Sequence, residues 1–191
     1  MKAHHKDYTS FTALVLFALA AFGLAYEHPM NQEPHYNSMT LTSPAFSYSD
    51  LIPARYTCDA ENISPPLEIG DIPPGTKSFA LIVEDIDAPG GVFTHLLAWN
   101  IPAARTSLAE GDLSSSLSES EGIQKGMTSA HTVGYVGPCP PQGERHRYHF
   151  RLRALDTMLD LPVGASRADL DSATGGHILT IARHMGLYER R

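Results

Sequence analysis

Apolar residues occur along the chain in short runs of strand length, separated by turns rich in proline and glycine. Residues 78–84 contain five consecutive apolar positions, Phe79 to Val83. A run this short without polar alternation predicts a strand that is covered on both faces and lies centrally in a sheet. Residues 95–101 form a second such run, which Pro102 ends. The two runs predict neighbouring strands in a buried sheet.

Residues 148–155 alternate regularly between apolar and polar side chains, which is typical of a half-buried strand. One face carries Tyr148, Phe150, Leu152 and Ala154. The other carries His149, Arg151 and Arg153. This is the most regular strand pattern in the sequence.

Two helices are predicted near the C-terminus. Ser166 followed by Asp169 forms a weak capping box, which starts a short helix. Residues 177–188 predict a C-terminal helix, because apolar side chains recur at i, i+3, i+4 and i+7. These are Ile178, Ile181, Ala182 and Met185. His177 and His184 lie a heptad apart, and we favour ordinary helix histidines over a metal-binding pair.

The remaining segments indicate many turns. Residues 105–132 are rich in Ser, Glu and Gly without a usable period, and we expect a long surface excursion there. The chain contains 14 prolines and 15 glycines in 191 residues, which suits one mainly β domain with few helices.

The N-terminus has the pattern of a secretory signal. Lys2 and Lys6 precede an apolar run from Phe11 to Ala25, which ends in small residues. Such a run spans about 22 Å as a helix, short of the roughly 30 Å of a bilayer core, so a retained membrane anchor is less favoured. We expect a signal peptide over 1–25, a flexible leader over 26–40 and a domain over 41–191. The protein would then be exported, either periplasmic or secreted.

Export changes the interpretation of the two cysteines. In an oxidising compartment Cys58 and Cys139 form the single possible intrachain bridge. It would close a loop of roughly 80 residues, worth about 4–5 kcal/mol in the chain-entropy model. The alternative is two buried free thiols, and the sequence leaves both open.

Candidate binding chemistry gathers around a loop rich in proline and glycine, residues 134–148. His146 and Tyr148 follow this loop two positions apart, so both point to one face of an extended segment. An imidazole beside a phenol suits a small polar or anionic ligand. Alternatively Tyr148 belongs to the core and His146 only caps the loop; the spacing does not decide. The formal charge of −7 argues against a nucleic-acid partner.

Two acidic residues end the first buried run. Asp85 and Asp87 are costly to hold there unless they are partnered or open to water, although either could serve as an ordinary turn residue. His95 opens the next strand ten residues after Asp85. If the two strands pair, all three residues lie near the same end of the sheet.

Four blocks of the sequence, taken in order, resemble the phosphatidylethanolamine-binding protein family, especially its bacterial branch of Raf-kinase-inhibitor-like proteins. They are residues 62–67, 85–89, 95–100 and 137–148. The resemblance covers roughly residues 41–191. It implies an antiparallel β-sandwich with a few peripheral helices and a small anion pocket at one end. Ile86 stands where the family usually has proline.

The resemblance also implies the pocket residues. They are Asp85, His95, His146 and Tyr148, with the loop that contains Gly137 and Pro140 as one wall. The histidines and Tyr148 would donate hydrogen bonds to the anion. Asp85 would hold an imidazole in its charged form or, alternatively, face the ammonium of a zwitterionic head group.

We therefore expect an exported protein that binds phosphate or a phosphorylated head group without a cofactor. Some relatives inhibit a kinase or protease, so a protein partner is a further expectation. The alternative is a hydrolase or metal-dependent enzyme that uses the same side chains. It is less favoured because these blocks contain no evident nucleophile except Cys139.

Overall fold

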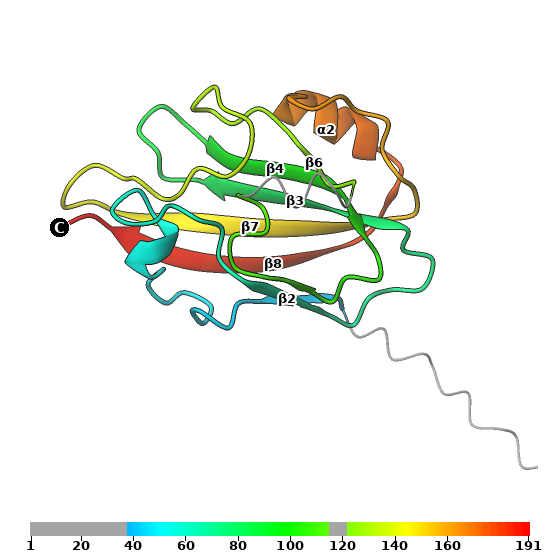
Figure 1. Ribbon diagram of the computed structural model, residues 1–191, viewed down its shortest axis with the longest axis horizontal. Helices are drawn as coiled ribbons and strands as arrows, with labels where there is room; N and C mark the ends of the chain where they lie inside the picture. The colour runs from blue at the N-terminus through cyan, green and yellow to red at the C-terminus, as the bar shows by residue number, and fades with distance from the viewer. Residues whose placement is uncertain (1–37, 115–121) are drawn as a thin grey trace, which may run out of the picture. The chain divides into compact units, whose positions relative to one another are not determined.

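The computed structural model describes residues 38–114 and 122–191, which form two antiparallel sheets (Figure 1). The smaller sheet has the order β1-β2-β5 and the larger one the order β6-β4-β3-β7-β8. The strands are β1 (Thr40–Thr42), β2 (Leu67–Gly70), β3 (Ser78–Asp85), β4 (Phe93–Pro102), β5 (Ser107–Leu108), β6 (Gln124–Lys125), β7 (Arg145–Leu155) and β8 (Ile178–Glu189). The helices are η1, a 3-10 turn (Ala54–Tyr56), and α2 (Arg167–Thr174). The mainly β, antiparallel fold is as expected.

Strand β3 is the centre of the larger sheet, as its continuous apolar run predicts. It pairs with β4 on one side and with β7 on the other, and all its residues are buried. Phe79 and Leu81 belong to the main core, which residues of the smaller sheet such as Leu67 complete. Ile82, which points to the opposite face, packs in a second cluster with Leu170 of α2. Both faces of β3 are therefore covered, which explains why it lacks polar alternation.

Strands β4 and β7 and helix α2 also form where the sequence predicts them. On β7 the apolar face predicted from the alternation is buried, with Tyr148 and Phe150 each 1% exposed. Helix α2 begins with a complete capping box, in which the side chains of Ser166 and Asp169 each accept a hydrogen bond from the other's backbone N–H. A capping box satisfies donors that the first helical turn leaves unpaired, and this fixes where the helix starts.

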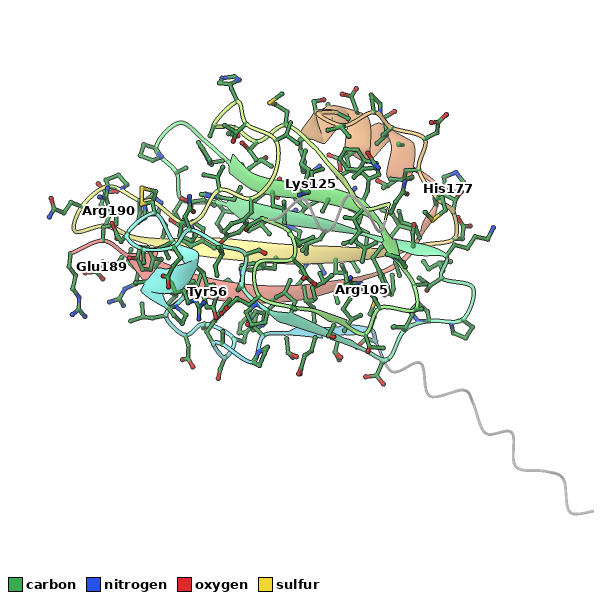
Figure 2. The ribbon with its side chains drawn as sticks, viewed as in Figure 1. Tyr56, Arg105, Lys125, His177, Glu189 and Arg190 are labelled. Carbon is green, nitrogen blue, oxygen red and sulfur yellow. A yellow bond between two sulfur atoms is a disulfide. The ribbon has the colours of Figure 1, made fainter. Side chains whose placement is uncertain are left out.

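The prediction of a C-terminal helix over residues 177–188 is wrong. These residues form β8, which pairs with β7 along its whole length and runs between the ends of the domain where His177 and Glu189 lie (Figure 2). Ala182, His184 and Tyr188 are buried against the core, as a period of two requires. The helical spacing of the apolar residues is outweighed by the eleven-residue edge that β7 offers for backbone hydrogen bonding.

The two histidines of that segment have ordinary partners. His177 Nδ1 lies 2.8 Å from Asp156 Oδ1. The Nε2 atom of His184 lies 3.3 Å from the carbonyl oxygen of Phe46. Neither contact involves the other histidine, and their positions on a strand remove the heptad relationship between them.

The segment 105–132 is more than a surface excursion. It supplies β5 and β6, and both Leu113 and Ile123 are buried. Residues 115–121 lie outside the described residues. Apolar anchors on both sides thus attach this segment to the core.

The expected signal peptide over 1–25 lies outside the described residues, as does most of the expected leader. The leader boundary at residue 40 is too late, because Met39 is buried and Thr40 already pairs with Gly70 in the smaller sheet. None of the helices formed by residues 38–114 and 122–191 has the length and apolar character needed to span a membrane.

The predicted disulfide between Cys58 and Cys139 is present, with the two Cα atoms 5.4 Å apart. It joins the loop after η1 to the loop before β7. A backbone hydrogen bond from Cys58 N to Pro138 O, 3.1 Å long, runs beside it.

Candidate functional site

The ends of three strands bring the four predicted side chains together. Asp85 ends β3, and its Cα partners are Phe93 on β4 and Tyr148 on β7. His146 lies two positions before Tyr148, on the same face of β7. Asp85 and His95 are 4% exposed, His146 3% and Tyr148 1%. Four polar side chains with so little exposure at one end of a sheet need internal partners. Asp85 and His146 bond to each other, whereas His95 bonds to the backbone carbonyl of Val136.

His95 reaches this group because β4 is irregular where it passes β3. Val83 is paired with Leu96 but Glu84 with Thr94, so His95 is an extra residue on β4. Such a β-bulge re-aims the side chain that it carries. The ring of His95 consequently meets the ring of Tyr148 edge-on, with the centroids 5.3 Å apart.

Asp85 accepts hydrogen bonds from several sides. Its Oδ2 atom lies 2.7 Å from His146 Nδ1, and its Oδ1 accepts the backbone N–H of Asp87 at 2.9 Å. Burial raises the pKa of Tyr148, as do the negative charge of Asp85 and a side-chain hydrogen bond to it. The raised pKa of Tyr148 thus reflects its burial next to the Asp85 carboxylate.

The pKa values of the two histidines are shifted in opposite directions. Burial lowers the pKa of His95 and outweighs the carbonyl of Val136, which lies 2.7 Å from Nδ1. The neutral ring therefore carries its proton on Nδ1 and donates it to Val136. Burial also opposes a charge on His146, but hydrogen bonds to Asp85 and Glu144 outweigh it and raise the pKa of His146. His146 is therefore the ring of the group that is protonated more readily, and His95 the one that is protonated less readily.

The second nitrogen of His146 faces an exposed carboxylate. His146 Nε2 lies 3.4 Å from Glu144 Oε2, and the Glu144 side chain is 58% exposed. The imidazolium thus connects a buried acid, Asp85, to an acid in water. Nothing in the sequence pattern singled out Glu144, because a glutamate after a turn is usually solvated.

The expected wall of the pocket is held in place by its own backbone contacts. Gly137 N donates to Asn62 Oδ1 at 2.7 Å, and the Tyr135 hydroxyl donates to the carbonyl of Tyr56 at 2.8 Å. A Cβ on Gly137 would lie 2.5 Å from Asn62 Oδ1. Gly137 and Pro140 are both buried. Their evident task is close packing, and Asn62 is an anchoring residue that the sequence analysis did not identify.

Asp87 has a different task from Asp85. It accepts hydrogen bonds from two of the three guanidinium nitrogens of Arg147, Nε at 2.9 Å and Nη2 at 2.6 Å, and from the backbone N–H of Arg147. These bonds hold the pKa of Asp87 down, at about 2. Ile86 N donates to the carbonyl of Arg147 at 3.3 Å, a bond that proline at this position could not make. The turn that aims Asp85 is thereby fixed to β7.

An open hollow of ≈ 580 Å³ lies beside these residues. Its lining residues are Asp87, Glu144, Arg145, His146, Arg147 and Leu187. Of the four predicted side chains, His146 lines this hollow, whereas Asp85, His95 and Tyr148 do not. Within the described part of the chain, no three His, Cys, Asp or Glu side chains are arranged to hold a metal ion.

The fold is that of the phosphatidylethanolamine-binding protein family. The family model of that name, "Phosphatidylethanolamine-binding protein", matches residues 42–189, and the chain belongs to this family.

Relatives and solved structures agree with this assignment. A UPF0098 protein of Methanothermobacter thermautotrophicus is 49% identical over 80% of this chain and 99% of its own length. Another, from Pyrococcus horikoshii, is 44% identical over 78% of this chain and 76% of its own length.

The solved structures are those of a phosphatidylethanolamine-binding protein homologue from Chlamydia trachomatis and of Escherichia coli YbcL, a member of the mammalian family. The first has a TM-score of 0.74 and 39% identity, the second 0.75 and 28%. Both comparisons cover 81% of this chain and 99% of the other.

Proposed function

We propose that this protein is an exported binding protein for a small phosphate-type oxyanion, which it holds at His146. The observation that carries the proposal is the buried hydrogen bond of 2.7 Å between His146 Nδ1 and Asp85 Oδ2. It fixes the tautomer and orientation of the imidazolium and leaves Nε2–H as its remaining donor. A charge-assisted donor of this kind is roughly twice as strong as a neutral one.

Asp85 does not oppose this function, although a carboxylate near an anion is repulsive. Its charge is met by His146 and by the backbone N–H of Asp87. The ion pair of Asp85 and His146 is neutral as a whole, and its positive member, His146, is the one that lines the hollow. The acid therefore acts as the group that keeps His146 protonated.

The family name supplies the second argument for the ligand class. The shared chemistry of free phosphate and a phosphoethanolamine head group is the phosphate oxygen, which Nε2–H of His146 can bind in either case. The hollow beside His146 contains Arg147 and Asp87 already bonded to each other, so it adds little net charge. The proposal therefore names the phosphate group and leaves the rest of the ligand to the binding assay.

Export is supported by two independent features. The N-terminal residues have the pattern of a secretory signal, and the domain contains a disulfide between Cys58 and Cys139. Structural disulfides persist mainly in oxidising compartments.

Calorimetric titration with inorganic phosphate at pH 6.5 tests the binding function. We expect His146→Gln to weaken binding at least about tenfold, a loss of roughly 1.4 kcal/mol. His177→Ala is the matched control, because His177 is an exposed histidine paired with Asp156 at the opposite end of β8 (Figure 2). Equal affinities for the wild type and His146→Gln would reject the proposal, as would the absence of binding to the wild type at millimolar phosphate.

A further inference from the structure

Glu144 stands out because it contacts the donor that the proposed function assigns to the ligand. Its Oε2 atom is 3.4 Å from His146 Nε2. Charge-assisted N–H···O bonds usually measure about 2.7–2.9 Å, so this contact is long and weak. The buried contact on the other side of the ring, at 2.7 Å to Asp85, is the strong one.

We propose that Glu144 is a specificity-determining residue of the site, whose carboxylate occupies the place of a ligand oxygen at His146 Nε2 and must be displaced when the ligand binds. This inference rests on the proposed function, since it assigns a competitor to the same donor. A carboxylate oxygen and a phosphate oxygen are both anionic acceptors, so only one of them can take this hydrogen bond.

The backbone around Glu144 is held firmly, whereas its side chain is free to move. Glu144 N donates to the carbonyl of Pro141 at 3.1 Å, and Gly143 N donates to that of Arg190 at 2.8 Å. Arg145 then enters β7 opposite Glu189. The side chain itself is 58% exposed. Displacement therefore needs only a rotamer change in water, which costs little and takes place on the ps–ns timescale of exposed side chains.

The other charged groups around the hollow do not compete for this carboxylate. Arg147 is held by Asp87, with the closest contact at 2.6 Å, and Arg145 by Glu189 at 2.8 Å. Glu144 therefore faces His146 while the neighbouring arginines are engaged elsewhere.

Displacement has a direct consequence for which ligands bind. A ligand must offer an oxygen that satisfies the imidazolium better than the resident carboxylate, as a phosphate oxygen does and a neutral hydroxyl does not. The apparent affinity is reduced by the fraction of molecules in which Glu144 occupies the donor. Removing its charge should therefore strengthen binding.

The test compares Glu144→Gln with Glu189→Gln, which removes the same charge from a carboxylate that bonds Arg145 and not His146. If Glu144 occupies the donor for 70–90% of the time, an order-of-magnitude assumption, Glu144→Gln binds inorganic phosphate about threefold to tenfold more tightly. We expect Glu189→Gln to change the affinity by less than about twofold, since this partly exposed carboxylate is paired with Arg145 and acts on His146 only through screened electrostatics. Phosphoethanolamine is the second probe. A gain with either probe supports the inference, and the probe that binds more tightly distinguishes free phosphate from a lipid head group.

A second measurement uses no ligand and reports the contact itself. NMR titration of the His146 ring should show a lower pKa in Glu144→Gln than in the wild type, because one of the two acids that raise the pKa is gone. Glu189→Gln should leave the His146 pKa close to the wild-type value. A merely structural role of Glu144 would not produce this difference.

The outcomes separate the two proposals. Binding by the wild type that Glu144→Gln leaves unchanged or weakens for both phosphate and phosphoethanolamine overturns the inference and leaves the proposed function intact. An unchanged His146 titration overturns the inference as well. No binding of phosphate or phosphoethanolamine to the wild type or Glu144→Gln overturns both.

Discussion

Asp85 and His146 are separated by 61 positions in the chain, yet Oδ2 of one lies 2.7 Å from Nδ1 of the other, and both side chains are about 95% buried. An acid and a base buried this deeply are costly to desolvate, and that cost is recovered only when each satisfies the other. The pairing of β3 with β7 places them side by side. The electrostatics of the site therefore depend on the sheet register.

Replacing Asp85 with asparagine should disable His146 while keeping its position. The amide oxygen can still accept from Nδ1, but the negative charge that favours the imidazolium is lost. We expect the pKa of His146 to fall and phosphate affinity to drop at least about tenfold. The free energy of unfolding should fall by about 2 kcal/mol, the usual value for a hydrogen bond to a charged group. NMR titration, calorimetry and urea denaturation measure the three effects.

The exposed Asp160 provides the control for this substitution. Asp160→Asn removes an equal charge and should leave all three quantities nearly unchanged. If Asp85→Asn retained a raised His146 pKa, Asp85 would not be the group that keeps the ring charged.

Anion affinity should decrease as the pH rises through the pKa of His146. The contacts with Asp85 and Glu144 outweigh burial and raise this pKa above 6.5. The ring is therefore charged at a pH below its raised pKa and loses its proton at a pH above it. Sulfate is the suitable probe, because its charge is constant between about pH 5 and 9. Titrations over this range should show weakening in the wild type and a flat profile in His146→Gln. A flat profile in both would mean that another group binds the anion.

Protonation of His146 also stabilises the folded protein, so this contribution to stability, like the anion affinity, decreases as the pH rises. Because the pKa of His146 is higher in the folded than in the unfolded state, its stabilising contribution is complete below about pH 6.5 and disappears as the pH rises through the folded-state value. His95 acts in the opposite direction. Burial lowers its pKa, so its contribution is present above about pH 6.5 and is lost on acidification.

Much of this fold follows from local sequence patterns. The continuous apolar run of β3 and the alternation of β7 report directly on burial, because each strand meets the same environment along its length. The capping box at Ser166 is likewise a local device. With two cysteines in the chain, Cys58 and Cys139 offered the single possible intrachain bridge, but the sequence left open whether it forms. The grouping of Asp85 with His95, His146 and Tyr148 came from the family resemblance.

Other features depend on partners far away in the chain. The spacing of Ile178, Ile181 and Ala182 suits a helix locally, and only the long edge of β7 makes that segment a strand. The bulge that turns His95 toward Tyr148 is set by the register between β3 and β4. The different charges of His95 and His146 follow from their acceptors, a carbonyl and a carboxylate. Such acceptors are tertiary contacts, and the spacing of residues does not contain them.

Gly137→Ala should destabilise the domain and loosen the loop next to the site. The added Cβ would lie 2.5 Å from Asn62 Oδ1 and 2.6 Å from the carbonyl of Tyr56, closer than real Cβ contacts. Forced overpacking usually costs about 1–3 kcal/mol. Gly90→Ala is the control, because a Cβ there meets no atom within 4 Å. Thermal denaturation should rank Gly137→Ala well below Gly90→Ala, and equal melting temperatures would contradict the close packing described here.

Asp87→Asn should remove part of the protein's acid sensitivity. The bonds from Arg147 hold the pKa of Asp87 at about 2, below its unfolded value of about 3.9. Its contribution is therefore complete above about pH 4 and is lost as the pH falls through about 2. Since Arg147 is 52% exposed, screening reduces the stabilisation by this ion pair to about 1 kcal/mol at neutral pH.

Urea denaturation at pH 7 and pH 2.5 should show a smaller change in the free energy of unfolding between the two pH values in Asp87→Asn than in the wild type. An identical change in both would show that Asp87 and Arg147 do not stabilise the folded state through this ion pair.

Reducing the disulfide should lower both the stability of the domain and its affinity for the anion. Cys58 and Cys139 are 81 positions apart, so their bridge removes much conformational entropy from the unfolded chain, and its loss typically costs about 2–5 kcal/mol. The affinity should fall because Asp59, next to Cys58, accepts a hydrogen bond from the hydroxyl of Tyr188 at 2.6 Å, and Tyr188 is the strand partner of His146.

We expect the variant in which serine replaces both cysteines to melt at a lower temperature and to bind phosphate a fewfold more weakly. Calorimetry on this variant and on wild type with and without reductant measures both effects. Since the bridge is the only target of a thiol reductant in this chain, reductant should have no effect on the double variant. Unchanged melting of the reduced wild type would mean that the hydrogen bond from Cys58 N to Pro138 O and the packing of Gly137 hold the loop without the bridge.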